Sequence, residues 1–316
     1  MSRYSKVDLT NIRLQSIADR TSKVAEGQWA KPFEPGDEFA RFIDSLPPIL
    51  AARDLVRLAD TIVAARTREK PVIMMIGGHV VKVGLAPVIC DLLERGILTG
   101  IAMNSAAAIH DVESALFGVT SEDVAEALAD GSFGMAGETG AFINGALSEA
   151  YRGDDPEIGF GEAVGERVLA EGSGRASILG TCVRLNLPVT VHVAIGADII
   201  HQQPTMDGAA TGELSFRDFR VLAHQLRSIG DGGVVMNVGS TVILPEVFLK
   251  ALTIARNLGA PAFNFTTANF DMIRHYRPRV NVLERPTREG GEYFDFAGHH
   301  EIMVPLLAGM AKRGRG

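Results

Sequence analysis

The chain has 316 residues, of which 46% are hydrophobic and 22% are charged, and its formal net charge is −7. This length allows a large buried core, and the acidic balance argues against a nucleic-acid binder, which needs clustered basic side chains to neutralise phosphates. No apolar run reaches the ~18 residues that a membrane span requires, and no basic–apolar leader is visible. We therefore expect a cytoplasmic protein with neither a nucleic-acid nor a membrane partner.

The first half of the chain predicts an arm followed by alternating helices and strands. Residues 1–45 are polar and irregular, with "KPFEPGDE" (31–38) typical of an extended arm, and residues 46–316 predict a single domain. Apolar spacing predicts helices at 49–65, 80–95 and 105–117, and short apolar runs predict strands at 71–78 and 97–104. Helical patterns predict an insertion around 120–186, whose first helix (120–128) begins at Thr120 or Ser121 as a cap.

The second half returns to strands and completes the fold class. Strands are predicted at 188–196, 232–239, 261–267 and 292–298, and helices near 215–228, 245–258 and 299–312. This alternation is typical of the α/β class, with a Rossmann-like, doubly wound, mostly parallel sheet and helices on both faces. Cys90 and Cys182 lie in apolar segments, which predicts buried free thiols in a reducing compartment.

In such a sheet, ligands bind at the carboxyl ends of the strands, so the residues that follow each strand are candidate binding residues. Small, hydroxyl and amide residues dominate there, and they let a ligand approach backbone N–H groups that suit phosphate oxygens. The candidates are Gly77, Gly78, Asn104, Ser105, Gly239, Ser240, Thr266, Thr267 and Asp271.

Histidines near the predicted strand ends are candidate catalytic residues. An imidazole at His79 or His201 suits general acid–base catalysis because it titrates near neutral pH. A second hypothesis is a metal-dependent hydrolase or lyase, in which His79, His110 and His201 converge on zinc or iron. No H-x-x-x-H or H-E-x-x-H spacing is present, so no metal ligand is assigned.

Five segments resemble, in order, segments of the deoxyhypusine synthase family over roughly residues 70–310. They are "LAPVICDLLERGILTGIAMNSAAAIHDVESAL", "NLPVTVHVAIGADIIHQQPTMDGAATGE", "GGVVMNVGSTVILPEVFLKAL", "APAFNFTTANFD" and "HHEIMVPLLAGMA". The resemblance implies an NAD-binding fold of the deoxyhypusine synthase type, NAD as the cofactor and a homotetramer. Matched residue by residue, it implies nucleotide or substrate contacts at Ser105, Ala106, Asp111, Asp207, Gly208, Gly239, Thr266 and Asp271.

The chain departs from this family at the catalytic lysine, which the family carries between its Thr/Asp strand and its last helix. Residues 272–298, "MIRHYRPRVNVLERPTREGGEYFDFAG", contain neither lysine nor tryptophan. Arginine cannot replace an imine-forming amine because it stays protonated. Deoxyhypusine synthesis by the lysine–imine route is therefore not expected.

Three functions remain open at this point. The first is an NAD-dependent oxidoreductase or transferase acting on a small amine or an amino or hydroxy acid. In it, His79 or His201 serves as acid–base catalyst, Asp207 and Glu213 hold a cationic amine, and Arg274 and Arg277 bind a carboxylate or phosphate. The second is the metal-dependent enzyme, and the third is a non-catalytic nucleotide-binding relative.

Overall fold

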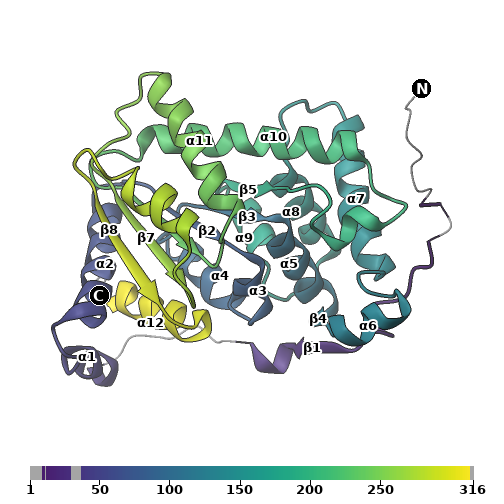
Figure 1. Cartoon of the computed structure of the whole chain (residues 1–316), viewed down its shortest axis with the longest axis horizontal. Coiled ribbons are helices and arrows are strands. Elements are labelled where there is room, and N and C mark those ends of the chain that lie inside the picture. The colour runs from purple at the N-terminus through teal and green to yellow at the C-terminus, as the bar shows by residue number, and fades with distance from the viewer. Residues whose placement is uncertain (1–8, 11, 30–36, 314–316) are drawn as a thin grey trace.

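The computed structural model describes residues 9–10, 12–29 and 37–313, and a six-stranded sheet forms its centre (Figure 1). The strand order is β5-β3-β2-β6-β7-β8. The strands are β2 (Val72–Ile76), β3 (Gly100–Asn104), β5 (Val189–His192), β6 (Val234–Val238), β7 (Thr266–Asp271) and β8 (Glu292–Ala297). Every neighbouring pair is parallel, which confirms the predicted doubly wound sheet. The chain first adds β3 and β5 on one side of β2, and then adds β6, β7 and β8 on the other side. The direction in which strands are added therefore reverses between β2 and β6.

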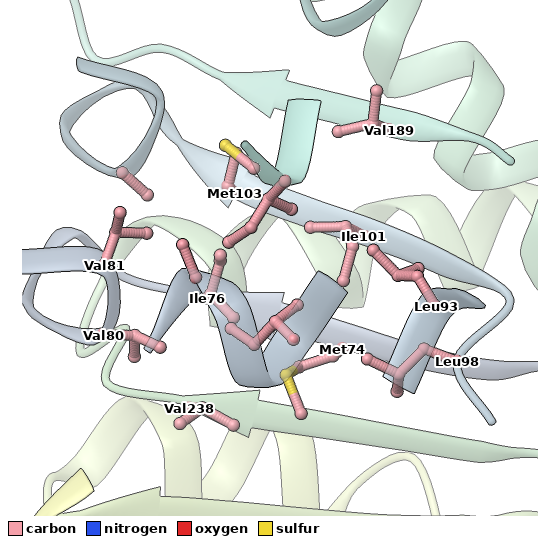
Figure 2. Close-up of a cluster of buried hydrophobic side chains, with 14 of the residues drawn as sticks. Met74, Ile76, Val80, Val81, Leu93, Leu98, Ile101, Met103, Val189 and Val238 are labelled. Carbon is pink, nitrogen blue, oxygen red and sulfur yellow. The ribbon is translucent and has the colours of Figure 1, made fainter. Parts of the chain in front are cut away.

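Helices cover both faces of this sheet. Ile73, Met75 and Val235 lie on the face covered by α10 (Gly208–Gln225), the 3₁₀ turn η3 (Leu226–Ser228), α11 (Ile243–Asn257) and the π-helical turn η4 (Pro278–Glu284). The helices on the other face include α2 (Leu50–Thr67), α3 (Gly78–Lys82), α4 (Ala86–Glu94), α5 (Ser105–Phe117) and α12 (His300–Arg313). Figure 2 shows the core on this second face, where Met74 and Ile76 of β2 contact side chains from β3, β6, α3 and α4.

The helical insertion lies beside the β5 edge of the sheet. It contains α6 (Val124–Asp130), α7 (Gly137–Arg152), α8 (Phe160–Glu171) and α9 (Ile178–Arg184). A short 3₁₀ turn, η2 (Ile199–Gln202), connects β5 to α10. Cys90 and Cys182 are both free and buried, as predicted. In the part of the chain that the structure describes, no helix combines the length and the apolar character needed to cross a membrane.

The described part of the N-terminal arm is fixed to the domain by a strand and a buried ion pair. Strand β1 (Ser22–Ala25), followed by the 3₁₀ turn η1 (Glu26–Gln28), pairs antiparallel with β4 (Val119–Glu122). The Arg20 guanidinium donates to Glu113 through two bonds of 2.9 and 2.8 Å, and both side chains are nearly inaccessible to water. Residues 31–36 of the predicted extended segment lie outside the described residues. The prediction is wrong for residues 37–38, which begin the helix α1 (Asp37–Asp44).

Of the predicted boundaries that are wrong, three have an identifiable reason. The helix predicted at 80–95 is two helices, because the chain turns at Gly84 with a φ of 82°. Thr120 and Ser121 lie in β4 because that segment pairs with the arm, and Asp123 caps α6 instead. The strand predicted at 261–267 begins only at Thr266, after Asn264 adopts a φ of 56°.

Glycines bring β2 and β6 into direct contact at the point where the winding direction reverses. A Cβ atom on Gly77 would lie 2.0 Å from the carbonyl oxygen of Gly239. Gly239 has a φ of 68°, a conformation that favours glycine. The Gly77 amide donates to Val238 O and the Gly239 amide to Phe270 O, each at 2.9 Å. These glycines therefore extend the sheet and let the backbones of the two strand ends meet.

The Arg20–Glu113 ion pair supplies the first test of this fold. Arg20→Met should lower the free energy of unfolding by about 3 kcal/mol, because it leaves a buried carboxylate without its cation. Lys23→Met is the matched control from the same arm. Its ion pair with Asp123 is exposed, so its loss should change the free energy of unfolding far less than the loss of the buried pair. Equal losses of unfolding free energy in the two variants, measured by urea unfolding, would contradict a stabilising buried ion pair between Arg20 and Glu113.

The contact between Gly77 and Gly239 supplies the second test. Gly77→Ala should lower the free energy of unfolding by about 3 kcal/mol or more, because the methyl group meets backbone that cannot move independently. Gly212→Ala is the control, since a Cβ there meets nothing within 4 Å and alanine raises helix propensity by up to about 1 kcal/mol. A Gly77→Ala protein as stable as wild type would show that the two strand ends do not touch.

Candidate functional site

Two buried side chains with unfilled hydrogen-bonding capacity stand beside the Gly77–Gly239 contact. His300, at the start of α12, donates from Nε2 to the carbonyl oxygen of Phe270 at 3.2 Å. Asp271, at the carboxyl end of β7, accepts the amide of Met272 on Oδ1 at 2.8 Å. His300 Nδ1 and Asp271 Oδ2 are buried and have no hydrogen-bond partner among the described residues. A buried acceptor without a donor costs about 1–3 kcal/mol, so this edge is suited to a ligand that donates hydrogen bonds.

His79 completes this group from the start of α3. Its ring lies edge-on to that of His300, with the centroids 5.7 Å apart. Burial, followed by the neighbouring His300 and Lys82, lowers the pKa of His79 below its usual 6.5. His79 is therefore neutral at pH 7 and available as a proton acceptor. We call Asp271, His300 and His79, together with the Gly77–Gly239 contact, the crossover site.

His201 lies in the loop that follows β5 rather than in the crossover site. Its Nδ1 accepts the amides of Gly196 and Asp198 at 3.2 and 3.3 Å, so its proton resides on Nε2. That Nε2 is buried and has no partner in the described chain. Burial lowers the pKa of His201, while nearby Asp198 opposes the shift. His201 is thus a neutral histidine held by its own loop.

The two acids predicted to hold an amine lie at the start of α10 with partners of their own. Asp207 caps α10 by accepting two of its first amides and lies 3.7 Å from Arg152. Glu213 pairs with Arg217 at 3.0 Å, one turn along the same helix. Neither acid affects the pKa of His79; the charged groups that shift this pKa are Lys82, His300, Glu301 and Asp271. Gly208, the first residue of α10, has open space where a Cβ would be.

The two arginines predicted to bind a substrate anion are already paired with acids. Arg274 donates to Asp295 at 3.0 Å, and Arg277 lies 3.3 Å from Glu246. Both guanidinium groups are exposed or half-exposed. A substrate carboxylate would have to displace these partners to form the predicted bidentate contact.

Three of the predicted cofactor residues have structural contacts. Asp111 is fully buried and holds the start of α9, accepting hydrogen bonds from the hydroxyl of its N-cap Ser177 at 2.6 Å and from its first two backbone amides. Asn104 caps α5 by accepting the amide of Ala107 at 3.0 Å. The Ser105 hydroxyl donates to the Asp198 carboxylate, which ties the end of β3 to the loop after β5.

The remaining predicted cofactor residues lie at opposite edges of the sheet. Thr266 and Thr267 begin β7 rather than end it, so they lie at the amino edge of the sheet, away from the carboxyl edge. The carbonyl oxygen of Ser240 accepts from Asn237 at 2.9 Å, which holds the turn after β6. Gly78 lies against Ala106, since a Cβ there would be 3.0 Å from the Ala106 methyl group.

A polar network that the sequence analysis missed crosses the carboxyl half of the sheet. Asn237 in β6 donates to Asn269 in β7 at 2.8 Å, and Asn269 donates to Asp295 in β8 at 3.0 Å. These residues are directly opposite one another in the strand register. Polar residues at alternate positions of buried strands were the available signal, but the pairing of the strands was needed to connect them.

A cavity of about 210 Å³ adjoins the crossover site on the β3 side. Its lining includes Lys82 from α3, Ala106 and His110 from α5, and Asp198 and Ile199 after β5. Burial raises the pKa of Asp198, against the effect of its hydrogen bond from Ser105. Arg20 and Glu113 also contact this space, so the N-terminal arm closes one of its sides. The sequence analysis missed Arg20, which lies in the irregular arm, and assigned no role to Asp198, which lies in the loop that follows β5.

The three histidines of the metal hypothesis have separate partners. His110 contacts the Thr120 hydroxyl at 2.7 Å, His79 faces His300, and His201 accepts amides of its own loop. Across residues 9–10, 12–29 and 37–313, no group of three or more His, Cys, Asp or Glu side chains is placed to hold a metal ion. The arrangement therefore gives no support to the metal-dependent alternative.

The donors and acceptors of the crossover site suit a dinucleotide better than a metal ion. A carboxylate at the end of a strand can accept ribose hydroxyl groups, and Asp271 Oδ2 is such an unpaired oxygen. The edge beside it carries no side chain at Gly77 or Gly239, where a Cβ would meet the opposite backbone or His300. These residues fit the ribose part of NAD.

Comparisons with known proteins identify the fold. No protein-family model and no curated protein sequence matches the chain. The chain is similar to a "putative deoxyhypusine synthase" from Entamoeba histolytica, at 11% identity and a TM-score of 0.52, over 89% of this chain and 96% of that one. It is also similar to a "conserved putative LOR/SDH protein" from Methanococcus maripaludis S2, at 16% identity and a TM-score of 0.51, over 83% and 69% of the two chains.

A third similar structure is AgrE, solved as a ternary complex with ornithine and NAD+. The match has 12% identity and a TM-score of 0.54, and it covers 89% of this chain but only 34% of AgrE. The chain thus spans about a third of the length of that enzyme. At these identities the likeness concerns the fold alone. The chain has the deoxyhypusine synthase-like α/β fold that its ordered sequence segments predicted.

Proposed function

We propose that this protein is an NAD-dependent enzyme acting on a small amine or an amino or hydroxy acid. One observation carries the proposal. Where the sheet reverses its winding direction, Gly77 packs against the backbone of Gly239, the His300 ring lies against Gly239, and two buried acceptors there, on Asp271 and His300, have no donor. Ligands of doubly wound sheets bind at this reversal point. The NAD+ in the similar AgrE structure is consistent with the choice of cofactor.

The residues of the crossover site would have distinct roles. Asp271 Oδ2 would accept ribose hydroxyl groups, and His300 Nδ1 would accept a further donor of the ligand. Bound NAD would supply a hydride acceptor at this edge. His79 is neutral because of burial and the charges near it, so it can take up a proton that the substrate releases. His201 is an alternative acid–base residue that only the sequence predicts, because an amide of its own loop already donates to its Nδ1.

The lysine–imine route of deoxyhypusine synthases is not part of this proposal. After Lys250 the chain carries a single lysine, Lys312. Its Nζ forms a buried ion pair with Asp91 at 3.1 Å, which occupies the amine. These residues agree better with a substrate whose amine or hydroxyl group is oxidised and whose product is not transferred to a lysine of the enzyme. The ornithine bound by AgrE makes amino acids the first compounds to screen.

We further propose that the protein forms a homo-oligomer, a tetramer by its resemblance to deoxyhypusine synthases. Exposed apolar side chains occur in the segments that follow β5, β6 and β7. They are Ile195, Val242, Met272, Ile273 and Tyr276. Apolar side chains exposed along one edge favour association, and a partner subunit there would help to close the crossover site.

Calorimetric titration with NAD+ tests the cofactor. Wild-type protein should bind NAD+ with micromolar affinity, and Asp271→Asn should weaken binding at least about tenfold, because it removes a charged acceptor. Asp130→Asn, at the exposed end of α6, should leave the affinity unchanged. Failure of wild-type protein to bind NAD+ would contradict the proposal. Binding without turnover of any amine, amino acid or hydroxy acid would favour the non-catalytic alternative.

A further inference from the structure

The cavity beside the crossover site contains a histidine whose protonation is set by a chain of hydrogen bonds. Glu113 accepts two bonds from Arg20 and one from Thr139 at 3.0 Å, so it is ionised and can only accept. Thr120 therefore donates its single hydroxyl proton to Glu113 at 2.6 Å. The Thr120 oxygen can then only accept from His110 Nδ1, which lies 2.7 Å away. His110 is consequently protonated on Nδ1 and carries a lone pair on Nε2.

The ring of His110 lies between Gly78 and the cavity, and its Nε2 is not among the fully buried side-chain atoms without a partner. A Cβ on Gly78 would lie 3.4 Å from His110 Cδ2, and Cδ2 is bonded to Nε2. His110 lines the cavity together with Lys82. Burial, only partly offset by Glu113, lowers the pKa of His110 to about 4. The imidazole is therefore neutral at pH 7.

Lys82 is the uncompensated cation of this cavity. The cavity holds a second cation, Arg20, but Glu113 neutralises it, with Glu122 3.8 Å away on its other side. Lys82 forms no ion pair with any residue in the described ranges. Two further acids line the cavity, Asp198 and Glu122. The Ser105 hydroxyl already binds Asp198, and Glu122 accepts the Gly134 amide at 3.0 Å. An anionic ligand group would therefore find its partner at Lys82.

The rest of the cavity limits the size and character of the ligand. Its volume of about 210 Å³ is below that of drug-sized ligand pockets. Ile109, Phe133 and Ile199 supply apolar lining. A compact molecule with one anionic end and a short apolar part fits this space.

We propose that the cavity binds a small carboxylic acid carrying a hydroxyl or amino group, with the carboxylate at Lys82 and the hydroxyl or amino group at His110 Nε2. The proton of that group moves to Nε2, and the imidazolium that forms keeps its Nδ1–H bond to Thr120. Glu113 stabilises this charge through the same hydroxyl. This inference rests on the proposed function, since it places the substrate of that enzyme beside the crossover site. It makes His110, rather than His79, the residue that takes the substrate proton.

Protection of His110 from carbethoxylation tests the binding part of this proposal. Diethyl pyrocarbonate attacks unprotonated imidazole nitrogens, and peptide mass spectrometry locates the adduct. His110 should be modified at pH 7, and L-lactate or L-alanine should slow its modification more than propionate, which lacks the hydroxyl or amino group. Lys82→Met should raise the concentration of L-lactate or L-alanine needed for protection at least about tenfold. Lys250→Met, an exposed lysine on α11, is the matched control.

The same labelling tests the hydrogen-bond chain. Thr120→Val removes the acceptor of the Nδ1 proton, so the proton can move to Nε2 and labelling at Nε2 should fall several-fold. Thr120→Ser keeps the hydroxyl and should label like wild type. Equal labelling of His110 with and without the three acids, or equal labelling of the two Thr120 variants, would overturn the proposal. Protection by L-lactate or L-alanine in a protein that does not bind NAD+ would uphold this cavity while removing the proposed cofactor.

Discussion

The close approach of β2 and β6 is the constraint on which the rest of the structure depends. Gly77 cannot carry a side chain without meeting the backbone of Gly239, so the backbones of the two strand ends meet where the sheet reverses its winding. The elements that follow these strands then spread to either side. His79 on α3 and His300 on α12 are brought within ring contact of each other, although more than two hundred residues separate them. The position of the crossover site is thus a property of the sheet, and its chemistry is a property of the residues around it.

Two polar arrangements divide the space around this edge. On the β7 side, Asp271 and His300 hold buried acceptors without donors, which is an unfavourable state that a ligand can relieve. On the β3 side, Arg20 and Glu113 form a filled network that extends through Thr120 to His110. The first arrangement favours a ligand rich in hydroxyl groups, and the second fixes one tautomer of a histidine. A dinucleotide and a small acid would each find the chemistry they need on opposite sides of Gly77.

The sequence predicted the fold better than the site. Short apolar runs identified the strands of the central sheet except β7, whose prediction overlaps it at two residues only. The predicted helix at 105–117 coincides with α5. Local patterns could not show that Thr120 pairs with β1, because its partner lies about a hundred residues earlier. They also gave no sign that Asp111 would hold the start of α9. Thr266 and Thr267 were placed at the wrong edge because an irregular apolar run before them resembled a strand. Contacts between distant segments decided each of these cases.

A structure of crystals grown with NAD+ would test the central claim most directly. The account predicts that the dinucleotide lies along the carboxyl edge of the sheet, passes over Gly77 and Gly239, and places a ribose hydroxyl group within hydrogen-bond distance of Asp271 Oδ2. The cavity lined by Lys82 and His110 would remain free for a second ligand. A dinucleotide bound elsewhere, or one that leaves Asp271 and His300 without donors, would contradict the account.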